Sequence, residues 1–209
     1  MKLKYKMLAL SAALAVSAVS LTSCLSDSSA QSTIFTLSSP DLASGTFATK
    51  FILNGFGCTG GNVSPQLVWS NPPAGTMSFS LHVYDPDAPS GSGFWHWAVY
   101  DMPASTTGLA QGAGNSPTTL PAGSFGGNND FFDTGTTGGN GNYGGPCPPA
   151  GDTPHRYIFT LYALSVPQVE VAAGVPKTGT AGLFGFALGR AGVGPAVLGT
   201  ATFTATYGR

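Results

Sequence analysis

The side chains that could support acid–base chemistry or ligand binding are few, and they occur in three short segments. The chain of 209 residues contains only three histidines and nine acidic residues. Asp85 and Asp87 directly follow an alternating apolar segment, and His96 and His155 each stand at the start of another. A side chain at a strand end can reach into a cleft while the sheet holds its backbone, so these four residues are the first candidates for a site.

Imidazole and carboxylate groups together allow more than one kind of site. Imidazoles titrate near neutral pH, so His96 and His155 can donate hydrogen bonds to an anion, more strongly when they are protonated. The Asp85 and Asp87 carboxylates can orient these imidazoles or accept from a cationic amine. Two histidines and one carboxylate can also form a catalytic zinc set, although no local His-x-x-x-His spacing favours it here.

Two of these features also have a purely structural interpretation. Proline fixes φ and aspartate caps turns, so the Asp-Pro-Asp-Ala-Pro-Ser run at 85–90 is explained equally well as a rigid turn. His82 lies on the polar face of its predicted strand, and we expect it to make a structural hydrogen bond.

Alternating apolar and polar residues predict the strands that must position these side chains. Residues 77–84 and 201–207 alternate with a period of two, which is typical of half-buried strands. Four further strands are predicted at 47–53, 66–70, 96–101 and 156–164. Several short strands separated by proline and glycine turns favour an all-β fold, an antiparallel β-sandwich.

One helix is predicted near the C-terminus. Thr178 or Thr180 would cap its start and Gly189 would end it. Leu183, Phe184, Ala187 and Leu188 would share its apolar face, while Gly182 and Gly185 each weaken the helix by about 1 kcal/mol.

A long segment rich in glycine, threonine, asparagine and serine runs from 104 to 142. A structureless loop of this length is unusual in a compact domain and is often functional. A solvated insertion explains the same composition, and the sequence does not decide between the two.

The composition excludes some partners. The first 23 residues contain three lysines and no acid, so without them the totals of 8 basic and 9 acidic residues become 5 and 9, a net charge of −4. No basic patch remains for nucleic acid. Hydrophobic residues make up 42% of the chain, enough for a core, while glycine and proline account for 46 of 209 residues. A loop-rich single domain is therefore expected.

The N-terminus predicts export. Lys2, Lys4 and Lys6 precede an apolar run of 13 residues from Met7 to Val19, which is shorter than the roughly 20 residues that span a bilayer. A basic start, a short apolar stretch and small residues at its end are typical of a secretory signal at 1–23.

The end of this leader predicts a lipid anchor. Leu21-Thr22-Ser23-Cys24 resembles the bacterial lipobox, in which the cysteine is acylated and becomes the mature N-terminus. Leu25 then favours delivery to the outer membrane. Cleavage of an ordinary signal after Ala30 would instead discard Cys24. Residues 24–33 are expected to form a Ser-rich tether, and 34–209 the functional domain.

The order of the motifs resembles one known family. Asp85 to Ser90, Trp95-His96-Trp97, and Gly144 to Asp152 followed by His155-Arg156-Tyr157 occur in the order found in phosphatidylethanolamine-binding proteins (PEBP), in their bacterial Raf-kinase-inhibitor-like branch. The resemblance covers residues 35–209 and implies a central β-sandwich with a short C-terminal helix. It also implies a small pocket that accepts phosphate-type head groups.

Carried onto this chain, the resemblance implies one set of ligand-binding residues. The pocket would be formed by Asp85, Asp87, Pro89, His96, Gly145, Pro149, His155 and Tyr157. Glycine lets main-chain N–H groups approach an anion, and proline keeps the rim rigid. Cys147 replaces a glycine of eukaryotic members, and the stretch from Asn129 to Tyr143 is expanded, so access to the pocket is expected to differ.

Cys58 and Cys147 remain once Cys24 carries the lipid. An even pair of cysteines in an exported protein favours a disulfide, which would tie the pocket segment to Cys58. Two buried free thiols are the alternative.

Three functions follow from these observations. The favoured one is a binding protein for a small phosphorylated or zwitterionic ligand, attached to the membrane by its lipid anchor. The second is an inhibitor or signalling module that acts on an envelope protease or kinase. The third is a metal-dependent hydrolase. We expect a binding protein rather than an enzyme, without cofactor or metal, and the resemblance allows a homodimer.

Overall fold

The structure, a computed structural model, describes residues 34–132, 136–137, 141–189 and 194–209. The predicted leader, the predicted lipidation residue Cys24 and the whole predicted tether lie outside these residues. Within the described part of the chain, no helix is long and apolar enough to cross a membrane.

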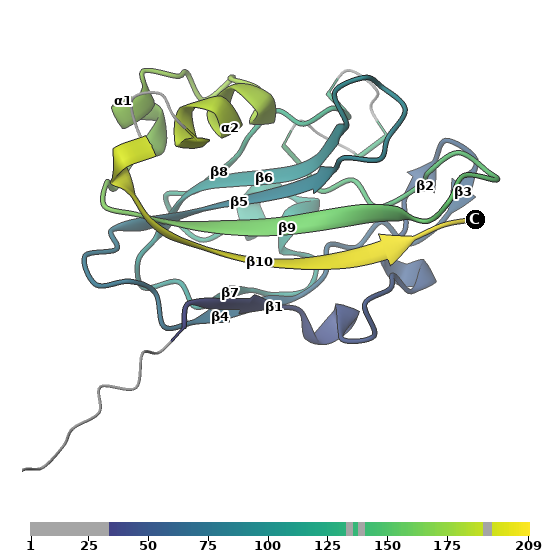
Figure 1. The fold of residues 1–209 in the computed structure, drawn as a ribbon, viewed down its shortest axis with the longest axis horizontal. Coiled ribbons are helices and arrows are strands. Elements are labelled where there is room, and N and C mark those ends of the chain that lie inside the picture. The colour runs from purple at the N-terminus through teal and green to yellow at the C-terminus, as the bar shows by residue number, and fades with distance from the viewer. Residues whose placement is uncertain (1–33, 133–135, 138–140, 190–193) are drawn as a thin grey trace, which may run out of the picture. The chain divides into compact units, whose positions relative to one another are not determined.

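A five-stranded antiparallel sheet forms the centre of the domain (Figure 1). Its strand order is β10-β9-β5-β6-β8. The bounds are Ser78–Asp85 for β5, Phe94–Pro103 for β6, Phe125–Gly126 for β8, His155–Leu164 for β9 and Val197–Tyr207 for β10. Three of the predicted strands lie within β6, β9 and β10, and a fourth overlaps β5, which confirms these four strands. β5 is buried on both faces, so the prediction of a half-buried strand at 77–84 was wrong.

A second sheet of three short strands covers one face of the first. Its order is β1-β4-β7, with bounds Thr36–Ser38, Leu67–Ser70 and Gly108–Leu109. Leu67 and Trp69 of this sheet share a buried core with Phe79, Leu81 and Phe159 of the large sheet. Side chains from two facing sheets that fill one core make a β-sandwich, the predicted fold.

Two helices cover the opposite face of the large sheet (Figure 1). They are α1, Val169–Ala173, and α2, Ala181–Gly189. The Thr180 hydroxyl accepts from the backbone N–H of Leu183 (3.2 Å), so it caps α2 as predicted. Phe184 is buried against the sheet, but Leu183 is 45% exposed, so the prediction that both share the apolar face was wrong.

The remaining regular structure is short. A hairpin of two residues per strand, β2 at Asn54–Gly55 and β3 at Cys58–Thr59, stands apart from both sheets. Five single-turn 3-10 helices cover Pro40–Leu42, Thr49–Phe51, Ala113–Asn115, Pro117–Thr119 and Gly194–Ala196.

Two predictions of local structure were wrong. Residues 47–53 contain a 3-10 turn instead of a strand, because the backbone of this segment bonds to loops and not to a neighbouring strand. Ile52 accepts from Asn62, and Leu53 donates to Pro146. The long 104–142 segment is not structureless, since it supplies β7, β8 and two of the 3-10 turns. Outside β7 and β8, hydrogen bonds from asparagine side chains and backbone hydrogen bonds in turns fix this segment.

Candidate functional site

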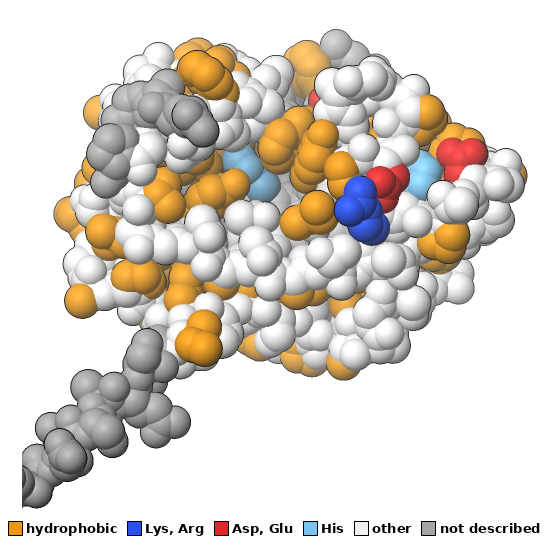
Figure 2. Space-filling model, in the orientation of Figure 1, with side chains coloured by type: hydrophobic (Ala, Val, Ile, Leu, Met, Phe, Trp, Pro, Cys, Tyr) orange, Lys and Arg blue, Asp and Glu red, His pale blue; other side chains and the backbone are white. Residues whose placement is uncertain are grey.

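Three strand ends meet at one end of the large sheet and bring the predicted segments together. β5 ends at Asp85, which pairs with Phe94 at the start of β6. β9 begins at His155, and Ile158 of β9 pairs with Tyr84 of β5. Antiparallel pairing places the end of one strand beside the start of the next, so residues 70 positions apart in sequence become neighbours. Figure 2 shows acidic, basic and histidine side chains side by side near this end of the sheet.

A buried ion pair lies at the centre of the site. His155 donates from Nδ1 to Oδ2 of Asp85 over 2.7 Å, and both side chains are 3% exposed. The second ring nitrogen, Nε2, lies 3.4 Å from Oδ2 of Asp152. Burial alone would lower the pKa of His155, but the hydrogen bonds to the two carboxylates outweigh it and raise the pKa. The two carboxylates therefore favour the protonated form of the His155 ring.

Asp87 makes a different ion pair on the surface. Its carboxylate accepts two bonds from the Arg156 guanidinium, at 2.7 and 2.9 Å, and one from the Arg156 backbone N–H at 2.9 Å. The hydrogen bonds from Arg156 lower the pKa of Asp87 to about 2. This bidentate pair ties the turn after β5 to the start of β9. With Asp152 and Arg156, Asp87 lines an open surface pocket, separate from the cavity beside His96.

His96 is buried and uncharged at neutral pH. Its Nδ1 lies 2.8 Å from the carbonyl oxygen of Gly144. A carbonyl only accepts, so Nδ1 carries the proton. Burial lowers the pKa of His96 to about 4, although the bond to Gly144 and the nearby Asp85 charge oppose that shift. In this tautomer the second nitrogen, Nε2, carries a lone pair.

A cavity of about 140 Å³ opens beside these side chains. Six of the eight predicted ligand-binding residues line it, namely Asp85, Pro89, His96, Pro149, His155 and Tyr157. Asp87 and Gly145 are not in its wall. Gly145 instead donates from its N–H to Oδ1 of Asn62 (2.8 Å), and a Cβ there would lie only 2.3 Å from the Phe51 carbonyl oxygen. Close backbone packing thus accounts for this glycine.

Tyr157 lines the cavity and has a buried, unpaired hydroxyl. The residue is 1% exposed, and its Oη has no hydrogen-bond partner among the described residues. The ring packs edge-on against Phe47 and His96, with centroids 5.2 and 5.0 Å apart. Burial raises the pKa of the hydroxyl well above its usual value, so it stays protonated and remains a hydrogen-bond donor.

Sequence reasoning missed most of the apolar wall. The other lining residues are Leu53, Phe56, Ala88, Phe94, Phe131, Cys147 and Pro148. Phe94 stands two residues before His96 on β6, so the strand period gave a signal for it. Phe131 comes from the long glycine-rich segment, where no periodicity marks it. Asp152 was inside a recognised motif, three residues before His155, but its contact with that ring was not predicted.

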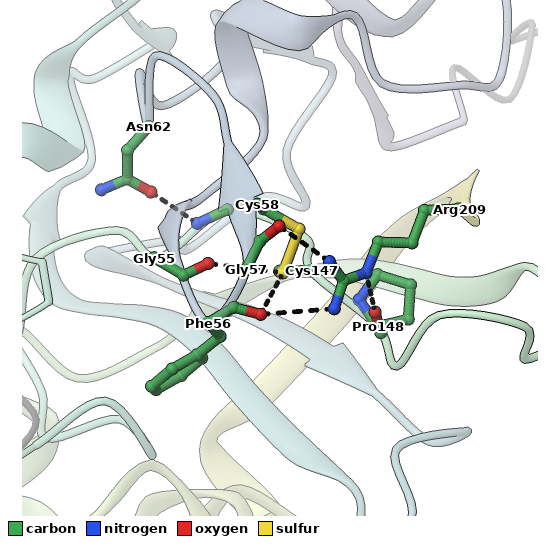
Figure 3. The surroundings of a disulfide bond; sticks show 9 residues. Gly55, Phe56, Gly57, Cys58, Asn62, Cys147, Pro148 and Arg209 are labelled. Carbon is green, nitrogen blue, oxygen red and sulfur yellow. Dashed lines mark hydrogen bonds between the residues drawn. A yellow bond between two sulfur atoms is a disulfide. The ribbon is translucent and has the colours of Figure 1, made fainter.

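A disulfide between Cys58 and Cys147 is present, as predicted (Figure 3). The two Cα atoms are 5.9 Å apart, and the cysteines are 89 residues apart in sequence. The bond joins the β2–β3 hairpin to the segment that contributes Pro148 and Pro149 to the cavity wall. The hairpin and the proline wall are therefore covalently connected.

Arg209 fastens the same two segments a second time. Its Nε donates to the Pro148 carbonyl over 2.7 Å, and its terminal nitrogens donate to the carbonyls of Gly57 (2.9 Å) and Phe56 (3.3 Å) (Figure 3). A guanidinium presents several donors in a fixed fork, which suits three converging carbonyl groups. The last residue of the chain thus braces the wall of the cavity.

The arrangement does not favour a metal centre. No group of three His, Cys, Asp or Glu side chains in the described residues could hold a metal ion. His155 and Asp85 bond to each other, and Nδ1 of His96 bonds to a backbone carbonyl. The site is instead a small, mostly apolar cavity with a few convergent polar groups at the end of a β-sandwich, the arrangement of a small-molecule pocket.

Comparison with known proteins identifies the class. The family model described as phosphatidylethanolamine-binding protein matches residues 38–207. YbcL of Escherichia coli is 46% identical over 145 residues, which cover 68% of this chain and 75% of YbcL. The chain belongs to the phosphatidylethanolamine-binding protein family.

Two solved structures of the family resemble this one. The crystal structure of YbcL, described as a new member of the mammalian PEBP family, has a TM-score of 0.71 at 39% identity, covering 84% of this chain and 98% of that one. A PEBP homologue from Chlamydia trachomatis has a TM-score of 0.62 at 27% identity, covering 84% and 97%. The fold and the family expected from the motifs are thereby confirmed.

A further relative bears on location. LppC of Mycobacterium tuberculosis, which carries the name of a lipoprotein, is 44% identical over 112 residues. The match covers 53% of this chain and 48% of LppC, so the chain spans about half the length of that relative.

Proposed function

We propose that the cavity binds a small phosphate-type or zwitterionic head group. The observation that supports this most directly is that six of the eight residues implied by the family resemblance line one cavity, His96, His155 and Tyr157 among them. The buried Tyr157 hydroxyl also lacks a partner among the described residues. Buried polar groups normally have partners, and a ligand that supplies them recovers the cost of leaving them unpaired.

The imidazolium of His155 supplies the positive charge next to the cavity. Asp85 holds its proton on Nδ1 and fixes the plane of the ring. The site therefore presents an imidazole ring that is already oriented beside the cavity. The proline and aromatic wall limits the ordering that binding requires.

We propose binding rather than covalent catalysis. The described residues that line the cavity include no serine, threonine or lysine, and the sulfur of Cys147 is in a disulfide. A covalent mechanism needs a nucleophile beside a base. The wall contains Asp85, His155 and Tyr157, but the first two bond to each other and the Tyr157 hydroxyl stays protonated.

We also propose that the protein acts in the cell envelope on a lipid anchor at Cys24. The lipobox-like end of the leader supports this, as does the similarity to LppC. Labelling of the expressed protein with a fatty-acid analogue is expected to be lost in Cys24→Ala. Equal labelling of both forms would contradict the proposal.

Isothermal titration calorimetry with O-phosphoethanolamine tests the proposed pocket. The wild type is expected to bind, and His155→Asn to bind at least tenfold more weakly, because a hydrogen bond to a charged group contributes ~1.5–3 kcal/mol. The asparagine amide can still donate to Asp85 in place of Nδ1, so the buried carboxylate keeps a partner. Asp41→Asn is the control, since its carboxylate bonds to Gln66 and Gln111, outside the cavity. Equal binding by wild type and His155→Asn would count against the proposal.

A further inference from the structure

The short stretch of chain just before the proline wall, Tyr143 to Gly145, has hydrogen bonds on two sides. On one side the Asn62 side chain donates from Nδ2 to the Tyr143 carbonyl (3.1 Å) and accepts at Oδ1 from the Gly145 N–H (2.8 Å). On the other side Gly144 donates from its N–H to the His96 carbonyl (3.0 Å) and accepts from Nδ1 of the His96 ring (2.8 Å). This stretch therefore lies between Asn62 and His96.

The Asn62 carboxamide takes the place of a neighbouring strand. In a β-ladder, the backbone groups of alternate residues bond to the same neighbour, and those of the residue between them point to the other side. An asparagine side chain offers both a donor and an acceptor, as a peptide group does. Here it bonds to Tyr143 and Gly145, while the residue between them bonds to His96.

Asn62 is itself fixed by contacts outside the cavity. Its backbone N–H donates to the Ile52 carbonyl over 2.8 Å, and its carbonyl accepts from Nδ2 of Asn115. Its φ of 48° lies in the left-handed region, which glycine and asparagine adopt most readily. Asn62 is not among the residues that line the cavity. An effect of Asn62 on the cavity must therefore pass through the stretch that it holds.

The Gly144 carbonyl determines which nitrogen of the His96 ring carries the proton. A carbonyl only accepts, so the nitrogen that lies 2.8 Å from it, Nδ1, is the protonated one. The position of this carbonyl depends in turn on the residues before and after it, both of which bond to Asn62. His96 lines the cavity, so its ring orientation and its tautomer are part of the surface that a ligand meets.

We propose that Asn62 is a positioning residue of the pocket, which fixes the ring orientation and the Nδ1–H tautomer of His96 through the Gly144 carbonyl. This inference rests on the proposed function, and it adds a residue that the cavity wall does not contain. Without the Asn62 amide, the Tyr143 carbonyl and the Gly145 N–H lose their partner. Gly144 can then shift, and the contact that holds the proton on Nδ1 weakens.

The variant Asn62→Gly removes the amide and keeps a residue that tolerates the left-handed backbone. Asn71→Gly is the matched control, because Asn71 also has a positive φ (55°) and its side chain bonds to Ile34 and Ser70, outside the cavity. Imidazole nitrogen NMR at pH 7 is expected to show His96 protonated at Nδ1 in the wild type and in the control. In Asn62→Gly, a substantial population protonated at Nε2 is expected.

A purely structural Asn62 would affect stability without changing this tautomer or the affinity for a ligand. Calorimetry is expected to show O-phosphoethanolamine binding about tenfold more weakly to Asn62→Gly than to the wild type, the equivalent of one hydrogen bond. Asn71→Gly is expected to bind as the wild type does. Asn62→Asp keeps the acceptor for Gly145 and lacks the donor for Tyr143, so it is expected to change the His96 tautomer in the same direction. It serves as the folded variant if the glycine substitution unfolds the chain.

The outcomes separate this inference from the proposed function. An unchanged His96 tautomer in the Asn62 variants, or an equal change in Asn71→Gly, would overturn the inference. A changed tautomer with wild-type affinity would also overturn it and leave the proposed pocket standing. Absence of binding by the wild type would contradict the proposed function and, with it, the inference. A changed tautomer together with weaker binding, in the Asn62 variants alone, supports both.

Discussion

Tyr157 and Tyr143 are both buried tyrosines, but only one of them has a partner for its hydroxyl. Tyr143 donates to the carbonyl of Phe51 over 3.0 Å, whereas Oη of Tyr157 faces no acceptor among the described residues. An unsatisfied buried hydroxyl costs about 1–3 kcal/mol. A ligand in the adjacent cavity that accepts a hydrogen bond from the Tyr157 hydroxyl would recover this cost.

The same substitution at the two tyrosines is expected to have opposite effects. Tyr157→Phe is predicted to weaken phosphoethanolamine binding at least tenfold without lowering the free energy of unfolding, since it removes an unpaired group. Tyr143→Phe is predicted to leave binding unchanged and to lower that free energy by about 1–3 kcal/mol, because the Phe51 carbonyl loses its donor. Calorimetry and urea unfolding measure the two effects. Loss of stability without loss of binding in Tyr157→Phe would refute the assignment.

At the scale of elements, the cavity wall depends on one covalent brace and one hydrogen-bonded brace. The Cys58–Cys147 disulfide and the Arg209 guanidinium both connect the 55–58 hairpin turn to the 147–149 segment. Neither of these short segments belongs to the two large sheets. Without the braces, their position would depend on a few backbone hydrogen bonds.

The disulfide is predicted to be the larger contribution to stability. The double variant Cys58→Ala/Cys147→Ala is expected to lower the free energy of unfolding by about 4–5 kcal/mol in the chain-entropy argument, because the closed loop is long. Urea unfolding of both forms under non-reducing conditions measures it. Arg209→Ala serves as the comparison and is expected to cost less, because the disulfide still closes the loop. A double variant as stable as the wild type would show that the bond does not brace the wall.

At the scale of the whole molecule, buried histidines link stability to pH. Burial lowers the pKa of His82 to about 3 and that of His96 to about 4, from an ordinary value of 6.5. Between the lowered pKa of each histidine and its ordinary value of 6.5, the unfolded chain binds protons that the native protein does not. Stability therefore falls as pH falls through this range. Asp101 acts in the opposite sense, since burial raises the pKa of its carboxyl to about 7. His155 contributes stability that is lost only as pH rises through its raised pKa.

A variant of His82 isolates one of these contributions. Nε2 of His82 lies 2.8 Å from the Tyr100 hydroxyl, a bond that a glutamine side chain can replace. As the pH is lowered from 6 to 4.5, the free energy of unfolding is expected to fall in both proteins. The fall is expected to be smaller in His82→Gln than in the wild type, by about 1 kcal/mol per pH unit. Urea unfolding at several pH values provides the slopes, and identical slopes would contradict the assignment.

The sequence predicted structure correctly where a short local pattern determines it. It did not predict positions that depend on contacts between segments far apart in the chain. The order of the motifs predicted that Asp85, His96 and His155 would meet, because each stands at a strand end. It did not distinguish Asp85 from Asp87, since their roles depend on which side of β9 each carboxylate faces. Residues 47–53 were predicted as a strand but have no strand beside them, and only the complete fold shows that.

The apolar wall was also beyond local patterns. Phe131 reaches the cavity from a segment whose glycine-rich composition suggests only solvent exposure. Its position depends on neighbours such as Asn129, whose amide bonds to the carbonyls of His96 and Asn142. Such long-range side-chain bonds leave no periodic trace in the sequence.

The central claim is that a phosphate-type head group binds between His96, His155 and Tyr157, and imidazole nitrogen NMR tests it most directly. The chain has three histidines, and His82 lies outside the cavity wall, so it is an internal reference. On addition of O-phosphoethanolamine, the ring nitrogens of His96 and His155 are predicted to shift in a saturable manner while those of His82 do not. Unchanged signals from His96 and His155 at saturating ligand would contradict the account.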